Sequence, residues 1–205
     1  MRELLEQAAG APVSRETRNK LDLFAELLLR ENERQNIISK VSAEDIWGRH
    51  LIDSAQLFSF GQPESRWLDI GSGPGLPGMV LAILGASSVT MVEPRKLRTA
   101  FLASCRDQLG LDNVEIVTGK VQSIAGAFDV ITARAVARLD RLFALAHRLS
   151  RPTSCWVLPK GRTAPKELEE ARVNWQGNFW LEPSLTDPDA RIVVARNVRP
   201  RTGRG

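Results

Sequence analysis

The residues best placed to do chemistry lie in one short stretch, LDIGSGPGLPG. They are Asp69, Gly71, Gly73 and Gly75. Glycines let a backbone turn sharply and approach a ligand closely, because no Cβ obstructs it. Dinucleotide sites use G-x-G-x-x-G, but the sixth position of this turn is Leu76. A carboxylate directly before the turn would repel a pyrophosphate and attract the ammonium group of a methionine moiety next to its sulfonium. The turn therefore favours S-adenosylmethionine, with a dinucleotide enzyme or a purely structural turn as alternatives.

A second acid supports a ligand that contains a nucleoside. Glu93 follows the apolar stretch from Ser88 to Val92, and a carboxylate at that place accepts hydrogen bonds from ribose hydroxyls. The pattern D-x-G-x-G-x-G, from Asp69 to Gly75, is the loop of S-adenosylmethionine-dependent methyltransferases. These acids and glycines together predict an enzyme that transfers a methyl group.

The sequence also limits the chemical class of the methyl acceptor. Enzymes that methylate exocyclic amino groups usually carry an Asn/Asp-Pro-Pro-aromatic motif after the fourth strand. This chain reads ITARAVARL there, which disfavours such an acceptor. Pyrimidine C5 requires an activated cysteine, and neither Cys105 nor Cys155 has neighbours that would activate it, so we expect reduced core thiols and no metal site. A ring nitrogen with a lone pair, such as guanine N7, needs no general base. Catalysis would then depend on in-line positioning and on the electrostatics of the pocket.

Basic residues follow several of the expected strands. The formal net charge is +4, and most of the 28 basic residues are arginines, which suit phosphates but are also enriched by a GC-rich genome. Because the carboxyl ends of parallel strands meet at one edge of a sheet, we expect these residues to surround the cofactor and bind RNA phosphates, with a solvated surface as the alternative. We expect no such cluster at the opposite edge. The candidate RNA-binding residues are Arg95, Lys96, Arg98, Lys120, Arg138, Lys160 and Arg162.

The elements that must position these residues alternate after Pro63. We expect strands at 66–70, 88–92, 114–118, 128–132, 155–158, 179–181 and 192–195, and helices at 76–84, 94–109, 136–149 and 165–173. This alternation predicts an α/β fold with a doubly wound, mostly parallel, Rossmann-like sheet and an antiparallel C-terminal hairpin. Before it, a helix over 15–36 and a second helix beginning at Ser42, with Asp45 completing a capping box, form a helical extension.

The chain of 205 residues is expected to form one structural domain. We divide it into a helical extension (1–62), a methyltransferase domain (63–197) and a basic tail (198–205). The arginine-rich segment from Arg191 onward is expected to act as a mobile RNA-binding tail or as a solubilising one. The apolar runs of the whole chain are far shorter than the roughly 20 residues that span a bilayer, and we see no secretory signal. We therefore expect a cytoplasmic monomer without a membrane partner.

Five stretches of the chain resemble the bacterial small-subunit rRNA guanine-N7 methyltransferases, also called glucose-inhibited division protein B. They read NIISKVSAEDIWGRHLIDS, LDIGSGPGLPG, VEPRKLRTAFL, DVITARAVARL and LPKG. The combination of GSGPGLPG with TARAVARL is specific to that family. The resemblance implies an S-adenosylmethionine-dependent class I methyltransferase that modifies N7 of a guanine in 16S rRNA, in the conserved loop near the decoding region. Its partner would be 16S rRNA or the small ribosomal subunit.

The resemblance also implies roles for individual residues. Gly71, Gly73 and Leu76 would line the methionine and ribose part of the cofactor site, with Asp69 before them and Glu93 on the ribose. Val121 and Gln122 would flank the adenine, and Arg134 would reach into the active site as the candidate catalytic residue.

Three residues match the family signature R-H-x-x-D-S: Arg49, His50 and Asp53. They are expected to face the cofactor or the RNA, although Arg49 and Asp53 also have the spacing of an ordinary helical ion pair. Lys120 and Gln122 depart from the arginine and glutamate usual in the family, which leaves the adenine contacts open. His147 is expected to be structural.

Two other functions stay open on the sequence alone. One is a small-subunit assembly or RNA-binding factor whose cofactor pocket is vestigial. The other is a small-molecule methyltransferase, which would work without RNA and show little dependence on salt.

Overall fold

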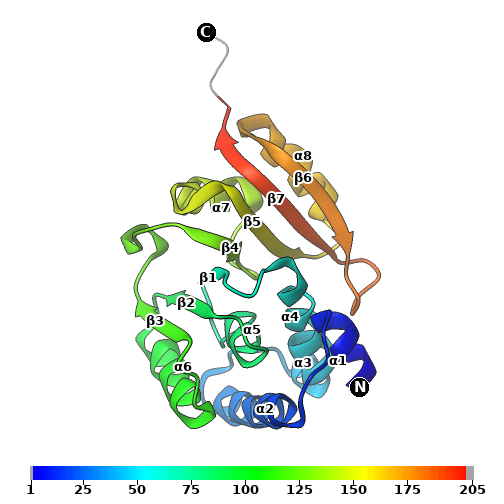
Figure 1. Cartoon of the computed structure of the whole chain (residues 1–205), viewed down its shortest axis with the longest axis vertical. Helices are drawn as coiled ribbons and strands as arrows, with labels where there is room; N and C mark the ends of the chain where they lie inside the picture. Colours follow the sequence, from blue (N-terminus) through cyan, green and yellow to red (C-terminus); the bar gives the residue numbers. More distant parts are fainter. Residues whose placement is uncertain (1, 202–205) are drawn as a thin grey trace.

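The computed structural model describes residues 2–201 as one seven-stranded sheet with helices on both faces (Figure 1). The strand order is β3-β2-β1-β4-β5-β7-β6. β1 to β5 are parallel, whereas β7 runs antiparallel to both β5 and β6. This confirms the predicted doubly wound sheet with its antiparallel C-terminal hairpin. The strands are β1 (Arg66–Ile70), β2 (Ser88–Glu93), β3 (Val114–Thr118), β4 (Phe128–Thr132), β5 (Ser150–Lys160), β6 (Trp175–Pro183) and β7 (Arg191–Pro200).

Helical elements precede β1 and then separate the strands. Before β1 lie α1 (Arg2–Ala9), α2 (Arg15–Gln35), α3 (Lys40–Glu44), the π-helical turn η1 (Trp47–Ile52), α4 (Asp53–Ala55) and the 3₁₀ turn η2 (Phe58–Phe60). The later elements are α5 (Gly78–Ile83), α6 (Lys96–Leu109), η3 (Val121–Ser123), α7 (Leu139–Ala146), η4 (His147–Leu149) and α8 (Ala164–Asn174).

The sheet has an apolar core on each face, because alternate side chains of a strand point to opposite sides. Trp67 packs into the core under α1, α2 and α5, whereas Leu68 and Ile70 pack into the core under α7 and α8. Helix α2 joins the first core through Phe24 and Leu28, which are fully buried at helical spacing. The N-terminal helices therefore cover one face of the sheet and bring residues 45–56 to the edge where the parallel strands end.

The prediction of one continuous helix beginning at Ser42 is wrong. The helix α3 begins earlier, at Lys40, and the following residues form separate helical turns. Ser39 caps α3 instead, because its Oγ accepts a hydrogen bond from the backbone N–H of Ser42 at 3.2 Å. Asp45 does not complete a capping box; its Oδ1 accepts from the backbone N–H of Gly48 at 3.0 Å and precedes the wide turn η1. Helix α1 was not predicted at all.

Helix α5 begins at Gly78 rather than at Leu76, and α6 and α7 also begin later than predicted. Arg95 is extended, so α6 begins at Lys96 rather than at Pro94. Residues 134–138 form a loop in which Ala135 has a φ of 55°, so α7 begins at Leu139 rather than at Val136. Both differences leave a longer loop at the edge of the sheet where a ligand binds in this fold class.

The segment expected as a tail is mostly strand. β7 extends to Pro200, and its last residues pair with Trp175 and Gln176 of β6. The Nε of Arg201 donates to the backbone oxygen of Arg172 at 2.8 Å, so residues 198–201 are not a tail. Residues 202–205 lie outside the described residues. Across residues 2–201, every helix is too short or too polar to cross a membrane.

Candidate functional site

The glycine turn connects β1 to α5. Gly71 and Gly73 have φ angles of 68° and 53°, a region that side chains rarely adopt. The backbone N–H groups of Gly71 and Ser72 both donate to the carbonyl oxygen of Val92, at 2.8 and 3.1 Å, which fixes the turn against β2. A Cβ placed on Gly73 would lie 3.7 Å from Nη1 of Arg98 and from the backbone oxygen of Gly71, which is ordinary van der Waals contact without crowding. At Gly73 the turn thus presents bare backbone with no crowding side chain against it, whereas a Cβ on Gly71 would meet Val136 at 2.6 Å.

Asp69 lies beneath this turn and is fully buried. Its Oδ2 accepts a hydrogen bond from the backbone N–H of Gly78 at 3.1 Å. Its Oδ1 has no hydrogen-bond partner among the described residues. Burial raises the pKa of Asp69 to about 7. An unpaired buried oxygen of this kind is a place for a hydrogen-bond donor supplied by a ligand.

Glu93 ties the glycine turn to the loop before α6. Its Oε2 accepts from the backbone N–H of Gly73 at 3.0 Å, and its Oε1 accepts from that of Arg95 at 2.9 Å. The Nη1 of Arg98 lies 3.9 Å from Oε2. Glu93 is only 3% exposed, so it holds the two loops at a fixed separation at the end of β2.

Arg134 follows β4 and binds two residues of the N-terminal helices. Its Nη1 lies 3.3 Å from Oδ2 of Asp53, and its Nη2 lies 2.5 Å from Nδ1 of His50. Burial, followed by the charges of Arg134 and Arg49, lowers the pKa of His50 to about 4, so the ring is neutral near pH 7. Nδ1 therefore accepts from Arg134, and the proton lies on Nε2, which has no partner in the described part of the chain.

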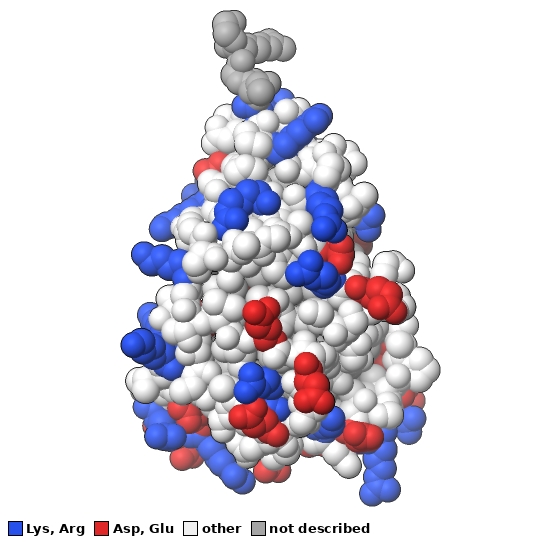
Figure 2. Space-filling model, turned by 60° about the vertical axis from the view of Figure 1, so that its left-hand side comes forward, with Lys and Arg blue, Asp and Glu red and all other residues white. Residues whose placement is uncertain are grey.

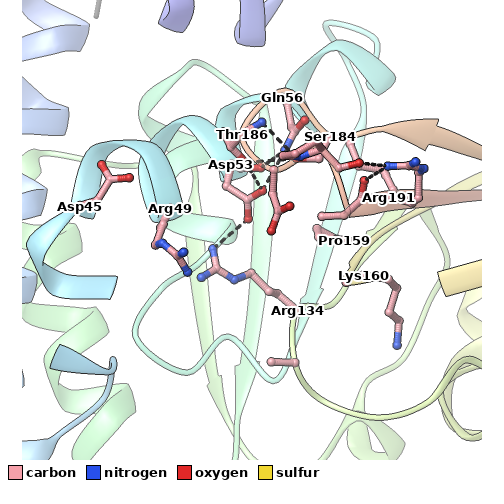
Figure 3. Close-up of a pocket in the computed structure, with 16 residues that line it drawn as sticks. Asp45, Arg49, Asp53, Gln56, Arg134, Pro159, Lys160, Ser184, Thr186 and Arg191 are labelled. Carbon is pink, nitrogen blue, oxygen red and sulfur yellow. Dashed lines mark hydrogen bonds and ion pairs between the residues drawn. The ribbon is translucent and has the colours of Figure 1, made fainter. Parts of the chain in front are cut away.

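The expected helical pair between Arg49 and Asp53 is not formed. Residues 47–52 form a π-helical turn, and Asp53 pairs with Arg134 instead. Burial raises the pKa of Asp53, whereas Arg134 opposes that shift. Within residues 2–201, Arg49 makes no ion pair and stays exposed beside Arg134 (Figure 3).

A cavity of about 580 Å³ opens next to Arg134. Its walls come from the segment 45–56, the loops after β4 and β5, and the loop 184–190 that joins β6 to β7 (Figure 3). This last loop is fastened to the N-terminal helices: the Oγ1 of Thr186 donates to Oδ1 of Asp53 at 3.0 Å, and the backbone N–H of Leu185 donates to Oε1 of Gln56 at 3.0 Å. The charged lining residues are Asp45, Arg49, Asp53, Arg134, Lys160, Asp187 and Arg191.

The structure brings most predicted cofactor residues together, but not all. Asp69, Gly71, Gly73 and Glu93 meet at the glycine turn, and Arg134 lies in the next loop along the sheet. Leu76 is 4% exposed and its side chain belongs to the apolar core, which leaves its backbone in the glycine turn as the part that faces the predicted site.

The residues expected around adenine lie in the turn η3 after β3. Val121 is buried in the second core, and the side chain of Gln122 is exposed. The Nη2 of Arg148 donates to the backbone oxygens of both residues, at 3.1 and 2.8 Å. Lys120 before them is exposed.

Lys160 differs most from its predicted role. Its Nζ donates to the backbone oxygen of Ala137 at 2.7 Å and to Oε1 of Glu167 at 3.0 Å, with 13% of its side chain exposed. It therefore supports the loop after β4 and offers RNA no freely exposed ammonium group. Arg138 pairs with Glu170, while Arg95, Lys96 and Arg162 are exposed.

The opposite edge of the sheet also carries basic residues, although no cluster like that of the cavity edge was expected there. Arg66 and Arg151 begin β1 and β5, and Arg199 lies near the end of the antiparallel β7, which places all three at that edge. Figure 2 shows basic side chains dominating the upper part of one face, over the half built from β5 to β7, with both signs mixed below. Charge alone therefore does not single out the cavity edge.

Several site residues were missed by sequence reasoning. Gln56, Ser184 and Thr186 join the two walls of the cavity, and buried Glu167 accepts from the backbone N–H of Leu139 at 2.6 Å. The contacts named here join positions 28 or more apart in the sequence, so local spacing carries no signal for them.

Other residues behave as predicted. His147 Nδ1 contacts the backbone oxygen of Phe143 at 3.1 Å, and its ring lies 5.1 Å from that of Trp175, as befits a structural residue. Cys105 and Cys155 are buried free thiols, and burial raises the pKa of Cys105 to about 12.

The family model described as GidB, rRNA small subunit methyltransferase G, matches residues 17–182. The chain belongs to the rRNA small subunit methyltransferase G family. Curated members with that name include one from Zymomonas mobilis, 44% identical over 96% of this chain and 92% of its own length. Another, from Rhizorhabdus wittichii, is 46% identical over 94% and 91%.

Solved structures support the same fold for this rRNA small subunit methyltransferase G family member. A mutant of MtNAS in complex with S-adenosylmethionine aligns with a TM-score of 0.59 at 20% identity, covering 88% of this chain and 75% of that chain. A ribosomal protein L11 methylase from Lactobacillus delbrueckii aligns with a TM-score of 0.56 at 15% identity, covering 75% and 79%. At these identities the likeness concerns the fold, which is the Rossmann-like fold of methyltransferases.

Proposed function

We propose that this protein transfers the methyl group of S-adenosylmethionine to N7 of a guanine in 16S rRNA. The observation that supports this most directly is the adjacency of two features at one edge of the sheet. One is the glycine turn over the unpaired oxygen of Asp69, and the other is the cavity beside Arg134. The first suits a cationic methyl donor, and the second has room for a purine.

The residues of the glycine turn fit this cofactor. The free Oδ1 of Asp69 suits the ammonium group of the methionine moiety, and the uncrowded backbone at Gly73, beside the flexible end of Arg98, suits the close approach of a ligand. Glu93 is the acceptor for the ribose hydroxyls, and η3 with Gln122 is the adenine side of the site. When bound, the cofactor supplies an electrophilic methyl group on a sulfonium.

Arg134 is the candidate catalytic residue. Two of its N–H groups are taken by Asp53 and His50, which fix the plane of the guanidinium, and others remain for a ligand. Guanine carries O6 beside N7, and an arginine donor on O6 orients the base while N7 stays free for the methyl group. N7 carries a lone pair and no proton, so the reaction needs positioning rather than a general base.

The exposed residues Arg95, Lys96, Lys120 and Arg162 are the proposed phosphate contacts at this edge. Arg98 and Arg138 belong to the same group through their remaining donors, since each also pairs with a glutamate. We further propose that the protein acts as a monomer in the cytoplasm, with the rRNA or the assembled small subunit as its macromolecular partner.

The test is methyl transfer from labelled S-adenosylmethionine to small ribosomal subunits from cells that lack the protein. We expect label in 16S rRNA as 7-methylguanosine, mapped by cleavage at the modified base. Free nucleosides and small molecules should take up no label. Label at another atom, or none despite cofactor binding measured by calorimetry, would contradict the proposal.

Replacing Arg134 separates an enzyme from an assembly factor with a vestigial pocket. We expect Arg134→Ala to lower kcat/KM by about 100-fold, the usual cost of losing a charged hydrogen-bond donor to the reacting group. Arg106→Ala, at the far end of α6, is the matched control and should leave the rate unchanged. If Arg134→Ala restored the cellular function without any methylation, the assembly role would be the correct one.

A further inference from the structure

The cavity extends along the sheet edge away from the glycine turn. At this edge the turn after β1 is followed by the loop after β4, the end of β5 and the loop 184–190 before β7. Neighbouring strands lie about 4.8 Å apart, so three spacings put the hairpin loop roughly 14 Å from the glycine turn. That span accommodates the reacting sulfonium and one purine ring between the glycine turn and the hairpin loop.

Asp187 is the acid that the hairpin loop contributes to the cavity. Its side chain is exposed and makes no ion pair with any residue from 2 to 201. Its Oδ1 accepts a single hydrogen bond, from the backbone N–H of Asp189 at 2.9 Å, so the carboxylate keeps acceptor capacity for a ligand.

The other two acids of the cavity are less suited to that role. Both oxygens of Asp53 are occupied, Oδ1 by Gln56 and Thr186 and Oδ2 by Arg134. Asp45 lies at the opposite end of the cavity, beyond Arg49, and caps the turn η1 (Figure 3). Of these three acids, only Asp187 comes from the hairpin loop, which lies three strands along the sheet from the glycine turn.

Guanine has a fixed polarity that matches this arrangement. When N7 faces the methyl donor, the opposite edge of the purine presents N1–H and the 2-amino group, which are hydrogen-bond donors. A carboxylate accepts from both. Adenine presents a lone pair at N1 in the same place, which a carboxylate repels. An acid on the far wall therefore selects guanine without touching the reacting atom.

We propose that Asp187 is the specificity-determining residue that accepts hydrogen bonds from N1–H and the 2-amino group of the target guanine. This rests on the proposed N7 methylation. The position of the loop is set by Thr186 and by the contacts of Gln56 with Ser184 and Leu185, so the carboxylate adjoins a fixed wall. On the side of the cavity opposite Asp187, Arg49 remains available for a phosphate of the RNA and Arg134 for O6 of the guanine.

The experiment is a double-mutant cycle between Asp187→Asn and the 2-amino group of the substrate. Unmodified 16S rRNA is prepared with its target guanosine either intact or replaced by inosine, which lacks that amino group but keeps N7. We expect wild-type kcat/KM to fall about 10- to 100-fold on inosine, the effect of losing a hydrogen bond to a charged group. In Asp187→Asn, kcat/KM on the guanosine-containing rRNA should fall by a similar factor. Replacing that guanosine by inosine should then lower kcat/KM of the variant by less than a further threefold.

Asp189→Asn is the matched control, because it is exposed on the same loop but does not line the cavity. It should retain the full wild-type discrimination. Equal penalties for inosine in the wild type and Asp187→Asn would overturn the assignment of Asp187, even if both form 7-methylguanosine normally. Failure of the wild type to form 7-methylguanosine would instead overturn the proposed function.

Discussion

At the scale of single residues, the site depends on buried groups whose charge is set by their surroundings. Asp69 and its glycine turn could be predicted, because the acid and glycines are adjacent in sequence and their chemistry is local. Lys160 could not, because its partner Glu167 makes it a buried structural cation, whereas its sequence neighbours indicate an exposed loop. An ionisable side chain therefore reveals its role only when its partners are known.

The pKa of Asp69 gives a prediction for stability. Folding raises this pKa from 3.8 to about 7, so the folded protein binds the proton more tightly than the unfolded chain does. The resulting stabilisation is complete below about pH 4 and is lost as the pH rises towards 7, at about 1.4 kcal/mol per pKa unit. Asp69→Asn should therefore gain free energy of unfolding relative to the wild type as the pH rises from 4 to 7.

Urea denaturation at several pH values measures this difference. Asp112→Asn, an exposed acid after α6, is the control and should follow the wild-type curve. Calorimetry of the same variants should show that cofactor affinity rises through pH 7 in the wild type and is weaker and pH-independent in Asp69→Asn. A parallel pH dependence of stability in the wild type and Asp69→Asn would rule out the raised pKa.

At the scale of elements, β1, β3 and β4 coincide with their predicted ranges, because short apolar strands between turns have clear limits. The segment 40–58 was predicted poorly. Its apolar residues suit a continuous α-helix, yet the contacts of His50 and Asp53 with Arg134 accompany a π-helical turn. Such a turn arises from long-range contacts, which periodicity does not encode.

Gln56 should be the residue that couples this turn to the β6–β7 loop. Its Nε2 donates to Oδ1 of Asp53 and to Oγ of Ser184, and its Oε1 accepts from the backbone N–H of Leu185. Gln56→Leu would remove all three hydrogen bonds and leave the N–H of Leu185 without its partner, and it should lower the free energy of unfolding by about 1–3 kcal/mol.

Urea denaturation and amide hydrogen exchange at residues 184–186 test the coupling, and exchange there should become faster. Gln108→Leu is the control, because that exposed side chain bonds only to Ser104 one helical turn away. Unchanged exchange in Gln56→Leu would show that the loop is held by other contacts.

At the scale of the whole molecule, fold class and family could be predicted, but the distribution of charge could not. Basic residues occur at both edges of the sheet, because arginines at strand starts, such as Arg66 and Arg151, lie opposite those that follow strand ends. The order of residues along each predicted strand indicates the edge of the sheet at which an arginine lies. It does not indicate which of the exposed basic side chains an RNA will contact.

The two ends of α6 offer a direct test of which edge binds RNA. Lys96 begins this helix at the cavity edge, and Arg106 ends it at the far edge. Lys96→Ala should weaken rRNA binding and reduce the slope of log K against log salt by about 0.7, the value for one lost phosphate contact on a single strand. Arg106→Ala should change neither; the reverse pattern, measured by salt titration of binding, would assign the RNA to the other edge.

The position of β7 has a consequence for how the molecule is made. It is the last of the seven strands to be synthesised, yet it lies between β5 and β6 and supplies one end of the cavity wall (Figure 1). While the chain is still emerging from the ribosome, β5 has an open edge and β6 has no neighbour to pair with. The nascent protein can therefore pair β1 to β5 before it completes the pocket, so methyl transfer must wait until β7 has been synthesised and inserted.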